Sequence, residues 1–205
     1  MKVLMLNGSP HEFGCTYTAL SETAKALNEY GIETEIVWLG KEPIEGCRGC
    51  SACRKLWKCV VEDKVNEFME KAEQADGFVF GSPVHYASAG GAITSFMDRM
   101  FFGHSKAMAY KPSAVVVSCR RGGATATFDQ LNKYFTINQM PVVSSNYWNQ
   151  IHGNTAEEAL KDEEGLQTMR VLGYNMAWLL KCIELGKKAG IEPEKEVKIK
   201  TNYIR

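Results

Sequence analysis

The chain has 205 residues, which is enough to bury a substantial core in one domain. Its 24 basic and 24 acidic residues give a formal net charge of +0, which argues against nucleic acid or an anionic membrane as the main partner. No apolar run approaches the roughly 20 residues that span a bilayer, and the apolar stretch at 1–6 is too short for a signal peptide. We therefore expect a cytoplasmic protein that does not bind membranes.

Short strands and helices alternate along the first part of the chain. The apolar segments that end at turn or loop signals are predicted to be strands at 3–6, 33–39 and 77–81. The segments whose apolar residues recur at helical spacing are predicted to be helices at 20–27, 63–72 and 93–100. The segment 46–60, which contains four cysteines, is predicted to be a loop.

The alternation continues to the end of the chain. The β-branched run 113–118 is the best strand candidate, and a helix is predicted around 128–135. Residues 141–143 are predicted to form the fifth strand. A last long helix is predicted to begin at the capping box Thr155 to Glu158 and to run to Gly190.

Five strands that alternate with helices predict an α/β fold, with a parallel sheet covered by helices on both faces. In such a doubly wound domain the ligand lies beyond the carboxyl ends of the strands. We expect one domain over residues 1–190, with the cysteine-rich loop 46–60 inside it and a charged tail over 191–205.

The loop 7–16 follows the first predicted strand and enters a helix. Gly8 and Gly14 allow the chain to wrap closely around an anion, where backbone N–H groups and the positive helix end converge. The loop lacks both the Lys-Ser/Thr pair of a P-loop and the G-x-G-x-x-G pattern, so it suits the single phosphate of a mononucleotide. An ordinary polar turn is the alternative. Its candidate side-chain donors are Ser9, His11, Thr16 and Thr18.

Two later loops lead to the same edge of the predicted sheet. Residues 81–91 form an aromatic, glycine-containing loop in which a planar ring system can lie against Tyr86. In residues 118–123 the glycines let a flat ligand approach the main chain, and an arginine can balance the charge of a reduced flavin. Each loop alone can be an ordinary turn, but three loops that converge on one edge favour a binding site.

These residues resemble the flavodoxin-like NADPH-dependent FMN reductases, a family that includes the iron–sulfur flavoproteins, over nearly the whole chain. The family usually has Arg where His11 stands and Asn where Cys15 stands, so the phosphate contact here relies more on the main chain or is weaker. The segment 96–99, Phe-Met-Asp-Arg, resembles the helix that follows the flavin loop, often near a dimer contact. The resemblance implies strand order 2-1-3-4-5. It implies FMN-binding roles for Ser9, His11, Cys15, Thr16, Thr18, Ser82, Pro83, Val84, His85, Tyr86, Ser118, Arg120, Gly122 and Gly123.

Four of the seven cysteines are close together, in the pattern C-x2-C-x2-C-x5-C. They are Cys47, Cys50, Cys53 and Cys59. This spacing can wrap one compact metal centre, and three alternatives stay open: a 4Fe–4S cluster, a zinc ion, and free or redox-active thiols. Basic residues between the cysteines would offset the charge of a thiolate centre and lower the thiol pKa values. The resemblance to iron–sulfur flavoproteins implies a cluster that passes electrons to FMN.

The function that the resemblance implies is an FMN-dependent oxidoreductase. It would carry electrons from NAD(P)H to a small acceptor such as flavin or quinone, without a dedicated catalytic acid or base residue. The alternative is a non-enzymatic iron–sulfur flavoprotein that docks a ferredoxin-like partner. The resemblance also implies a homodimer or a dimer of dimers, in which the flavin pocket is completed across subunits.

Overall fold

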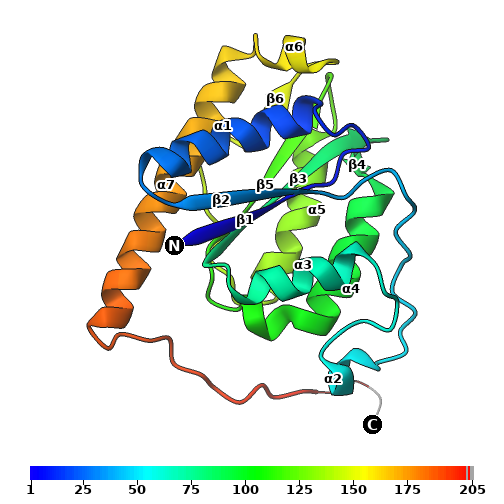
Figure 1. Cartoon of the computed structure of the whole chain (residues 1–205), viewed down its shortest axis with the longest axis vertical. Coiled ribbons are helices and arrows are strands. Elements are labelled where there is room, and N and C mark those ends of the chain that lie inside the picture. The colour runs from blue at the N-terminus through cyan, green and yellow to red at the C-terminus, as the bar shows by residue number, and fades with distance from the viewer. Residues whose placement is uncertain (202, 204–205) are drawn as a thin grey trace.

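The computed structural model, which describes residues 1–201 and 203, shows a sheet between two layers of helices (Figure 1). The sheet order is β2-β1-β3-β5-β6, all pairs on this path are parallel, and the short β4 pairs antiparallel with β3. The predicted doubly wound parallel sheet is therefore confirmed. The strands are β1 (Lys2–Asn7), β2 (Glu33–Trp38), β3 (Gly77–His85), β4 (Ser88–Ala89), β5 (Ser113–Cys119) and β6 (Gln150–His152).

The helices divide between the two faces of the sheet (Figure 1). One face packs against α1 and α7, and the other packs against α3, α4 and α5. The helices are α1 (Cys15–Glu29), α2 (Cys53–Leu56), α3 (Lys64–Glu73), α4 (Gly91–Met108), α5 (Ala124–Thr136), α6 (Ala156–Ala159) and α7 (Glu163–Lys188). The short α2 lies within the cysteine segment, which was predicted to be a loop.

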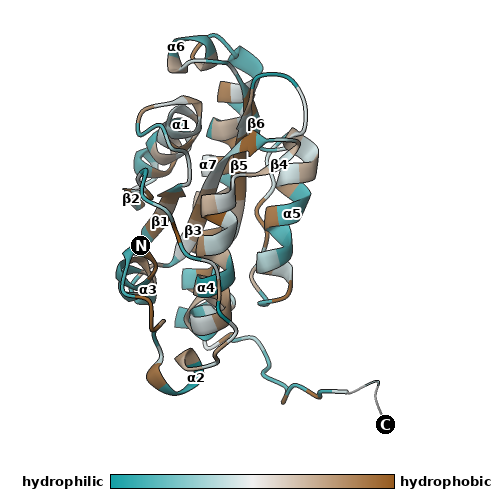
Figure 2. Cartoon of the chain, turned by 90° about the vertical axis from the view of Figure 1, so that its right-hand side faces the viewer, coloured by the Kyte–Doolittle hydropathy of each residue, from teal (hydrophilic) through white to brown (hydrophobic). Residues whose placement is uncertain are grey.

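Alternation along the inner strands builds two cores. Val3 and Met5 of β1 pack on the α1 and α7 side, whereas Leu4 and Leu6 pack on the side of α3, α4 and α5. Because an inner parallel strand is buried on both faces, it reads as a continuous apolar run. Figure 2 shows the resulting hydrophobic sheet between helices whose outer faces are more hydrophilic.

The fifth strand lies later in the chain than predicted. Residues 141–143 meet the sheet only at the bridge between Val142 and Ser113, at the start of β5. The chain then leaves the edge and returns as β6, which pairs with Val117 to Cys119 at the other end of β5. The assignment of the fifth strand to 141–143 was wrong because β6 has a single apolar residue, Ile151, whose burial depends on distant packing.

The last helix is interrupted. Thr155 caps α6 by accepting a hydrogen bond from the Glu158 N–H, as the capping box predicted, but the helix ends at Ala159. Asp162 then caps α7 through the Gly165 N–H and also accepts the backbone N–H of His152. One aspartate therefore fixes the start of α7 against β6, and the prediction of a single helix was wrong.

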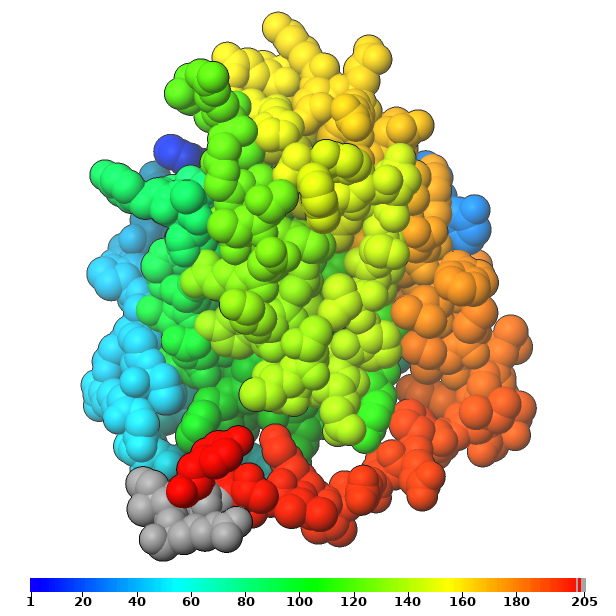
Figure 3. All heavy atoms as spheres, turned by 180° about the vertical axis from the view of Figure 1, so that it is seen from behind, coloured from blue at the N-terminus to red at the C-terminus, as the bar shows by residue number. Residues whose placement is uncertain are grey.

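The described part of the predicted tail 191–205 has neither helix nor strand and is exposed. It runs across one end of the molecule, in red, in Figure 3. Residues 202, 204 and 205 lie outside the described residues. Within the described part of the chain, no helix combines the length and the apolarity that crossing a membrane requires.

Candidate functional site

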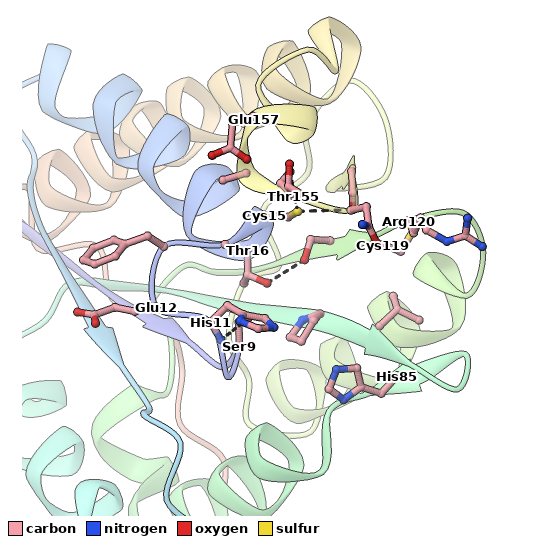
Figure 4. A pocket seen from close by; sticks show the side chains of 18 of the residues that line it. Ser9, His11, Glu12, Cys15, Thr16, His85, Cys119, Arg120, Thr155 and Glu157 are labelled. Carbon is pink, nitrogen blue, oxygen red and sulfur yellow. Dashed lines mark hydrogen bonds between the residues drawn. The ribbon is translucent and has the colours of Figure 1, made fainter.

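A cleft of about 700 Å³ opens at the carboxyl ends of β1, β3 and β5 (Figure 4). Small-molecule sites commonly have volumes of roughly 300–1,000 Å³. The cleft lies where the doubly wound topology predicts it, beyond the carboxyl edge of the sheet. Its lining consists of Ser9, residues 11–16, Trp38, Lys41, residues 83–85, residues 118–120 and residues 153–157.

The structure brings most of the predicted site residues together. Those that line the cleft are Ser9, His11, Cys15, Thr16, Pro83, Val84, His85, Ser118 and Arg120. Those outside the lining are Thr18, Ser82, Tyr86, Gly122 and Gly123. The part that each would play toward a flavin stays a prediction.

The loop after β1 is held in shape by its own hydrogen bonds. The Ser9 N–H donates to Asn7 Oδ1 at 3.1 Å, and the His11 N–H donates to Ser9 Oγ at 3.1 Å. Asn7 Nδ2 donates to the Glu12 carbonyl at 2.8 Å. From β2, Trp38 Nε1 donates to the Ser9 carbonyl at 2.9 Å. The loop is therefore organised before any ligand binds.

Gly8 brings this loop into contact with β3. Its N–H donates to the Gly81 carbonyl at 2.9 Å. A Cβ at Gly8 would lie 2.8 Å from the Cβ of Ile93 and 2.9 Å from the Gly81 oxygen. Only glycine fits this approach, which holds the start of the loop against β3.

The N-terminus of α1 points its free backbone donors at the cleft. Its N-cap, Gly14, makes no side-chain capping bond, and its first turn contains no acidic residue. The first N–H groups of a helix have no intrahelical partner, and the helix dipole is positive at this end. Helices α4 and α5 also begin behind glycine N-caps without a side-chain cap. Of the three, only the start of α1 lines the cleft, and it is available to an anionic ligand there.

Two side chains of α1 link the loops around the cleft. The Thr16 hydroxyl lies 2.8 Å from the Ser118 hydroxyl, and both residues are buried. Cys15 Sγ donates to the carbonyls of Thr155 at 3.2 Å and Gly153 at 3.5 Å. Burial raises the pKa of the Cys15 thiol, so it stays protonated at neutral pH and adds no negative charge beside the helix end.

The loop after β3 forms a tight hairpin. Tyr86 and Ala87 form its two-residue turn with φ of 50° and 58°, a conformation that favours glycine or asparagine. The Tyr86 side chain is fully exposed and points away from the cleft lining. Gly123, with φ of 91°, lies against Ala87, because a Cβ there would be 2.6 Å from the Ala87 Cα. The hairpin and the start of α5 therefore support one another.

Two other predicted residues bond within the scaffold. The buried Ser82 hydroxyl donates to the Pro83 carbonyl at 2.8 Å and accepts the Gly90 N–H at 3.4 Å. The Thr18 hydroxyl donates to the Gly14 carbonyl at 3.3 Å. Both side chains shape the loops rather than face the cleft.

Sequence reasoning missed several lining residues. Trp38 ends β2 and Lys41 follows it, at the same edge of the sheet, so the topology rule that found the other loops applied to them as well. The lining segment 153–157 follows β6. It was missed because the fifth strand was placed at 141–143, which moved the expected loop away from its true position.

The four clustered cysteines lie around one small hollow of about 20 Å³. Cys47 and Cys50 are exposed, whereas Cys53 and Cys59 are partly buried. Among the described residues, no three histidine, cysteine or acidic side chains are placed closely enough to hold a metal ion. The thiols are gathered but not arranged as ligands.

The charges around the hollow differ from the prediction. Burial, and then the neighbouring thiols, raises the pKa of Cys53. The basic residues of the segment were predicted to lower the thiol pKa values, but Arg48 pairs with Glu45, and Lys58 pairs with Glu62 at 2.7 Å. These ion pairs weaken the field that the thiols experience.

One buried arginine joins the cysteine segment to the domain. Arg99 of α4 is 3% exposed, and its Nη2 donates to Asp63 Oδ1 at 2.8 Å and to the Val61 carbonyl at 2.9 Å. Its Nε donates to Cys59 Sγ at 3.3 Å, and its Nη1 donates to the Glu45 carbonyl at 3.3 Å. The guanidinium thus fixes both ends of the segment.

The hollow and the cleft lie along the same helix. The first turn of α4 packs through Ile93 against Gly8, at the start of the loop whose later residues line the cleft, and a Cβ at Gly103 would lie 3.3 Å from the Cys53 Cβ. Gly103 lies 12 positions after Gly91, a rise of about 18 Å at about 1.5 Å per residue. In Figures 1 and 2, α2 accordingly lies at the end of the molecule opposite α6.

Known proteins agree with this geometry. The sequence profile of the NADPH-dependent FMN reductases matches residues 1–155. An iron–sulfur flavoprotein of Methanocaldococcus jannaschii is 32% identical over 192 residues, which cover 90% of this chain and 100% of that protein. RosB with a bound riboflavin-phosphate intermediate superposes with a TM-score of 0.71 at 16% identity, covering 100% of this chain and 92% of RosB. A flavodoxin from the domain Archaea superposes with a TM-score of 0.61 at 14% identity, covering 88% of this chain and 99% of that flavodoxin.

Proposed function

We propose that this chain, which belongs to the NADPH-dependent FMN reductase family, holds FMN in the cleft at the carboxyl edge of its sheet and carries electrons from NAD(P)H to a small acceptor. The observation that carries the proposal is the uncapped N-terminus of α1, which has no acidic residue in its first turn and faces a cleft of about 700 Å³. This is the arrangement that a phosphate needs.

The residues of the first loop fit a phosphate. The backbone N–H groups at the start of α1 would bind it, with Ser9 and Thr16 supplying hydroxyls at the floor of the cleft. His11 lies on the same loop and adds a donor in place of the arginine usual in the family (Figure 4). Because Cys15 bonds to the 153–155 loop, it positions the helix end and does not itself bind the phosphate.

The other two loops fit the flat ring of a flavin. Residues 83–85 and 118–120 line the cleft on β3 and β5, and Arg120 there can balance negative charge on the ring. When bound, FMN accepts hydride from a reduced nicotinamide and releases electrons to an acceptor. The chain's part is to orient the ring and to leave one face open, so we assign no catalytic acid or base.

We propose further that Cys47, Cys50, Cys53 and Cys59 hold a 4Fe–4S cluster. The support is that all four line one hollow beside the buried Arg99, and that the relative from Methanocaldococcus jannaschii is named an iron–sulfur flavoprotein. Four thiolates are the usual donor set for such a cluster, which carries single electrons. The present hollow of about 20 Å³ has room for about one water molecule, so the segment must open to receive a cluster.

The absorption spectrum of protein purified without oxygen tests both cofactors. We expect a flavin spectrum and, after anaerobic reconstitution, about four irons per chain. The Cys53→Ser variant should lose iron and retain flavin, whereas Cys182→Ser, at an exposed cysteine of α7, should retain both. Absence of iron after reconstitution contradicts the cluster and leaves zinc or free thiols, which zinc analysis and thiol titration distinguish.

Turnover separates an enzyme from an electron carrier. Oxidation of NADPH or NADH with quinone or free flavin as acceptor supports the oxidoreductase. The carrier alternative is favoured by a surface beside the cysteines, where Trp57 and Phe102 are exposed next to Lys106 and Arg54. No turnover with either nicotinamide, together with reduction by a ferredoxin-like protein, would establish the carrier.

The native mass of the FMN-loaded protein tests the proposed dimer or dimer of dimers.

A further inference from the structure

A second groove, of about 370 Å³, lies between α1 and the edge strand β2. It shares Glu12, Phe13 and Trp38 with the flavin cleft, so the two hollows adjoin. Its lining consists of Glu12, Phe13, Tyr17, Thr34, Ile36 and Trp38.

The groove is open because the edge strand is only partly covered. Ile36 and Trp38 pair with Met5 and Asn7 of β1 and therefore face the α1 side of the sheet. However, none of the residues of β2 is fully buried. The aromatic and aliphatic side chains of β2 therefore form a partly exposed strip beside α1. This strip and β3 lie on opposite sides of the loop 7–16.

The walls of the groove are aromatic and fixed. Phe13 packs edge-to-face on Tyr17 with ring centroids 5.1 Å apart, yet it is 65% exposed. Trp38 is held by its hydrogen bond to the Ser9 carbonyl, and the Lys64 ammonium lies 5.7 Å from its ring centroid. Rigid exposed rings of this kind stack on planar heteroaromatic rings.

Charged groups lie at the junction of the two hollows. Lys41 lines the flavin cleft beside Trp38, and it forms no ion pair among the described residues. Glu12 lines both hollows. An ammonium suits a phosphate, and a carboxylate accepts hydrogen bonds from ribose hydroxyls.

We propose that this groove binds the adenosine end of the nicotinamide dinucleotide donor, with the adenine ring against Phe13, Tyr17 and Trp38 and the pyrophosphate beside Lys41. The inference rests on the proposed function, because it supplies the donor with a second binding site beside the cleft. It explains why the exposed Phe13 ring borders the proposed phosphate-binding loop.

The test compares two donors that differ only in the adenosine end. The Phe13→Ala variant should raise the KM for the full dinucleotide about tenfold, in line with the stacking of one base on one aromatic side chain. The KM for reduced nicotinamide mononucleotide, which lacks the adenosine end, should rise by less than the KM for the full dinucleotide. The control Trp178→Ala removes an exposed aromatic residue of α7 and should leave both KM values unchanged.

A binding measurement tests the groove without turnover. Calorimetric titration of the FMN-loaded protein with 5′-ADP should show binding that is lost in Phe13→Ala and weakened in Lys41→Ala. If the protein binds ADP but oxidises no reduced nicotinamide, the proposed function is refuted, whereas the assignment of the groove as an adenosine-binding site stands.

Other results would overturn the groove assignment. Turnover in which Phe13→Ala raises the KM for both donors equally refutes it. A rise in the KM for the acceptor alone would also refute it, because that result would place the acceptor ring in the groove. If the protein does not bind ADP and Phe13→Ala changes its native mass, the groove is instead a contact between two copies of this chain.

Discussion

Replacement of Arg99 by lysine would show how firmly one buried guanidinium holds the cysteine segment. The guanidinium donates to the Asp63 carboxylate, to the carbonyls of Val61 and Glu45, and to the Cys59 thiol. A lysine ammonium keeps the charge but cannot reproduce the planar fork, so both carbonyls and the thiol lose a donor. A buried acceptor without a partner costs about 1–3 kcal/mol. One of the two carbonyls lies near the surface, where water can replace the lost donor, so it contributes less. We therefore expect the free energy of unfolding to fall by about 2–4 kcal/mol.

Urea unfolding followed by circular dichroism measures this loss, and limited trypsin digestion locates it. The segment offers trypsin Arg48, Arg54, Lys55 and Lys58, so its release should accelerate cleavage there before the domain unfolds. Arg170→Lys is the matched control, because it alters a single, partly exposed ion pair worth about 0.2–1 kcal/mol. An Arg99→Lys protein that matches this control in stability and in cleavage would refute the anchoring argument.

Two further substitutions probe the cleft and the charge at the sheet edge. Gly8→Ala places a Cβ 2.8 Å from an α4 side chain, so it should lower the free energy of unfolding by about 1–3 kcal/mol and lower the FMN content of purified protein. The control Gly186→Ala, at an open helical position, should leave the stability unchanged or raise it. Equal effects of the two variants on stability would contradict the packing argument. Hydrogen bonds from Lys2 and then Lys71 lower the pKa of Glu35, so its stabilisation exists at neutral pH and disappears as the pH falls through that lowered pKa. Glu35→Gln should therefore lower the free energy of unfolding by about 1 kcal/mol at pH 7 and by progressively less as the pH falls. A loss that does not change with pH in urea titrations would contradict the assignment.

The inner strands could be predicted because burial on both faces gives them continuous apolar runs. Residues 113–118, predicted as a strand, are β5 with one further residue. Strand β6 escaped prediction because only Ile151 is apolar, and its pairing with β5 is made by residues more than 30 positions away. The same error hid the 153–157 loop, since a loop that follows a strand is found only when the strand is found.

Side-chain direction was harder to predict than loop position. A loop was expected over 81–91, but β3 continues to His85 and pairs with β4, so that the turn is only Tyr86 and Ala87. The two residues have positive φ angles and Tyr86 is fully exposed, and no pattern of residue types announces such angles at Tyr and Ala. Arg99 shows the same limit. It lies between the buried residues Phe96 and Met100 on α4, and its partner Asp63 is 36 residues earlier, so the ion pair exists only in the folded chain.

Helix α4 connects these observations. Ile93, in its first turn, packs against Gly8 and so supports the loop that follows β1. Arg99, six residues or about 9 Å further along, holds the cysteine segment, and Gly103 lies against Cys53. Changes at the two ends share a rigid element but no side-chain partner, so their effects on stability should add. A departure from additivity between Gly8→Ala and Arg99→Lys would mean that α4 shifts as a unit, and that the cysteine segment and the cleft are mechanically coupled.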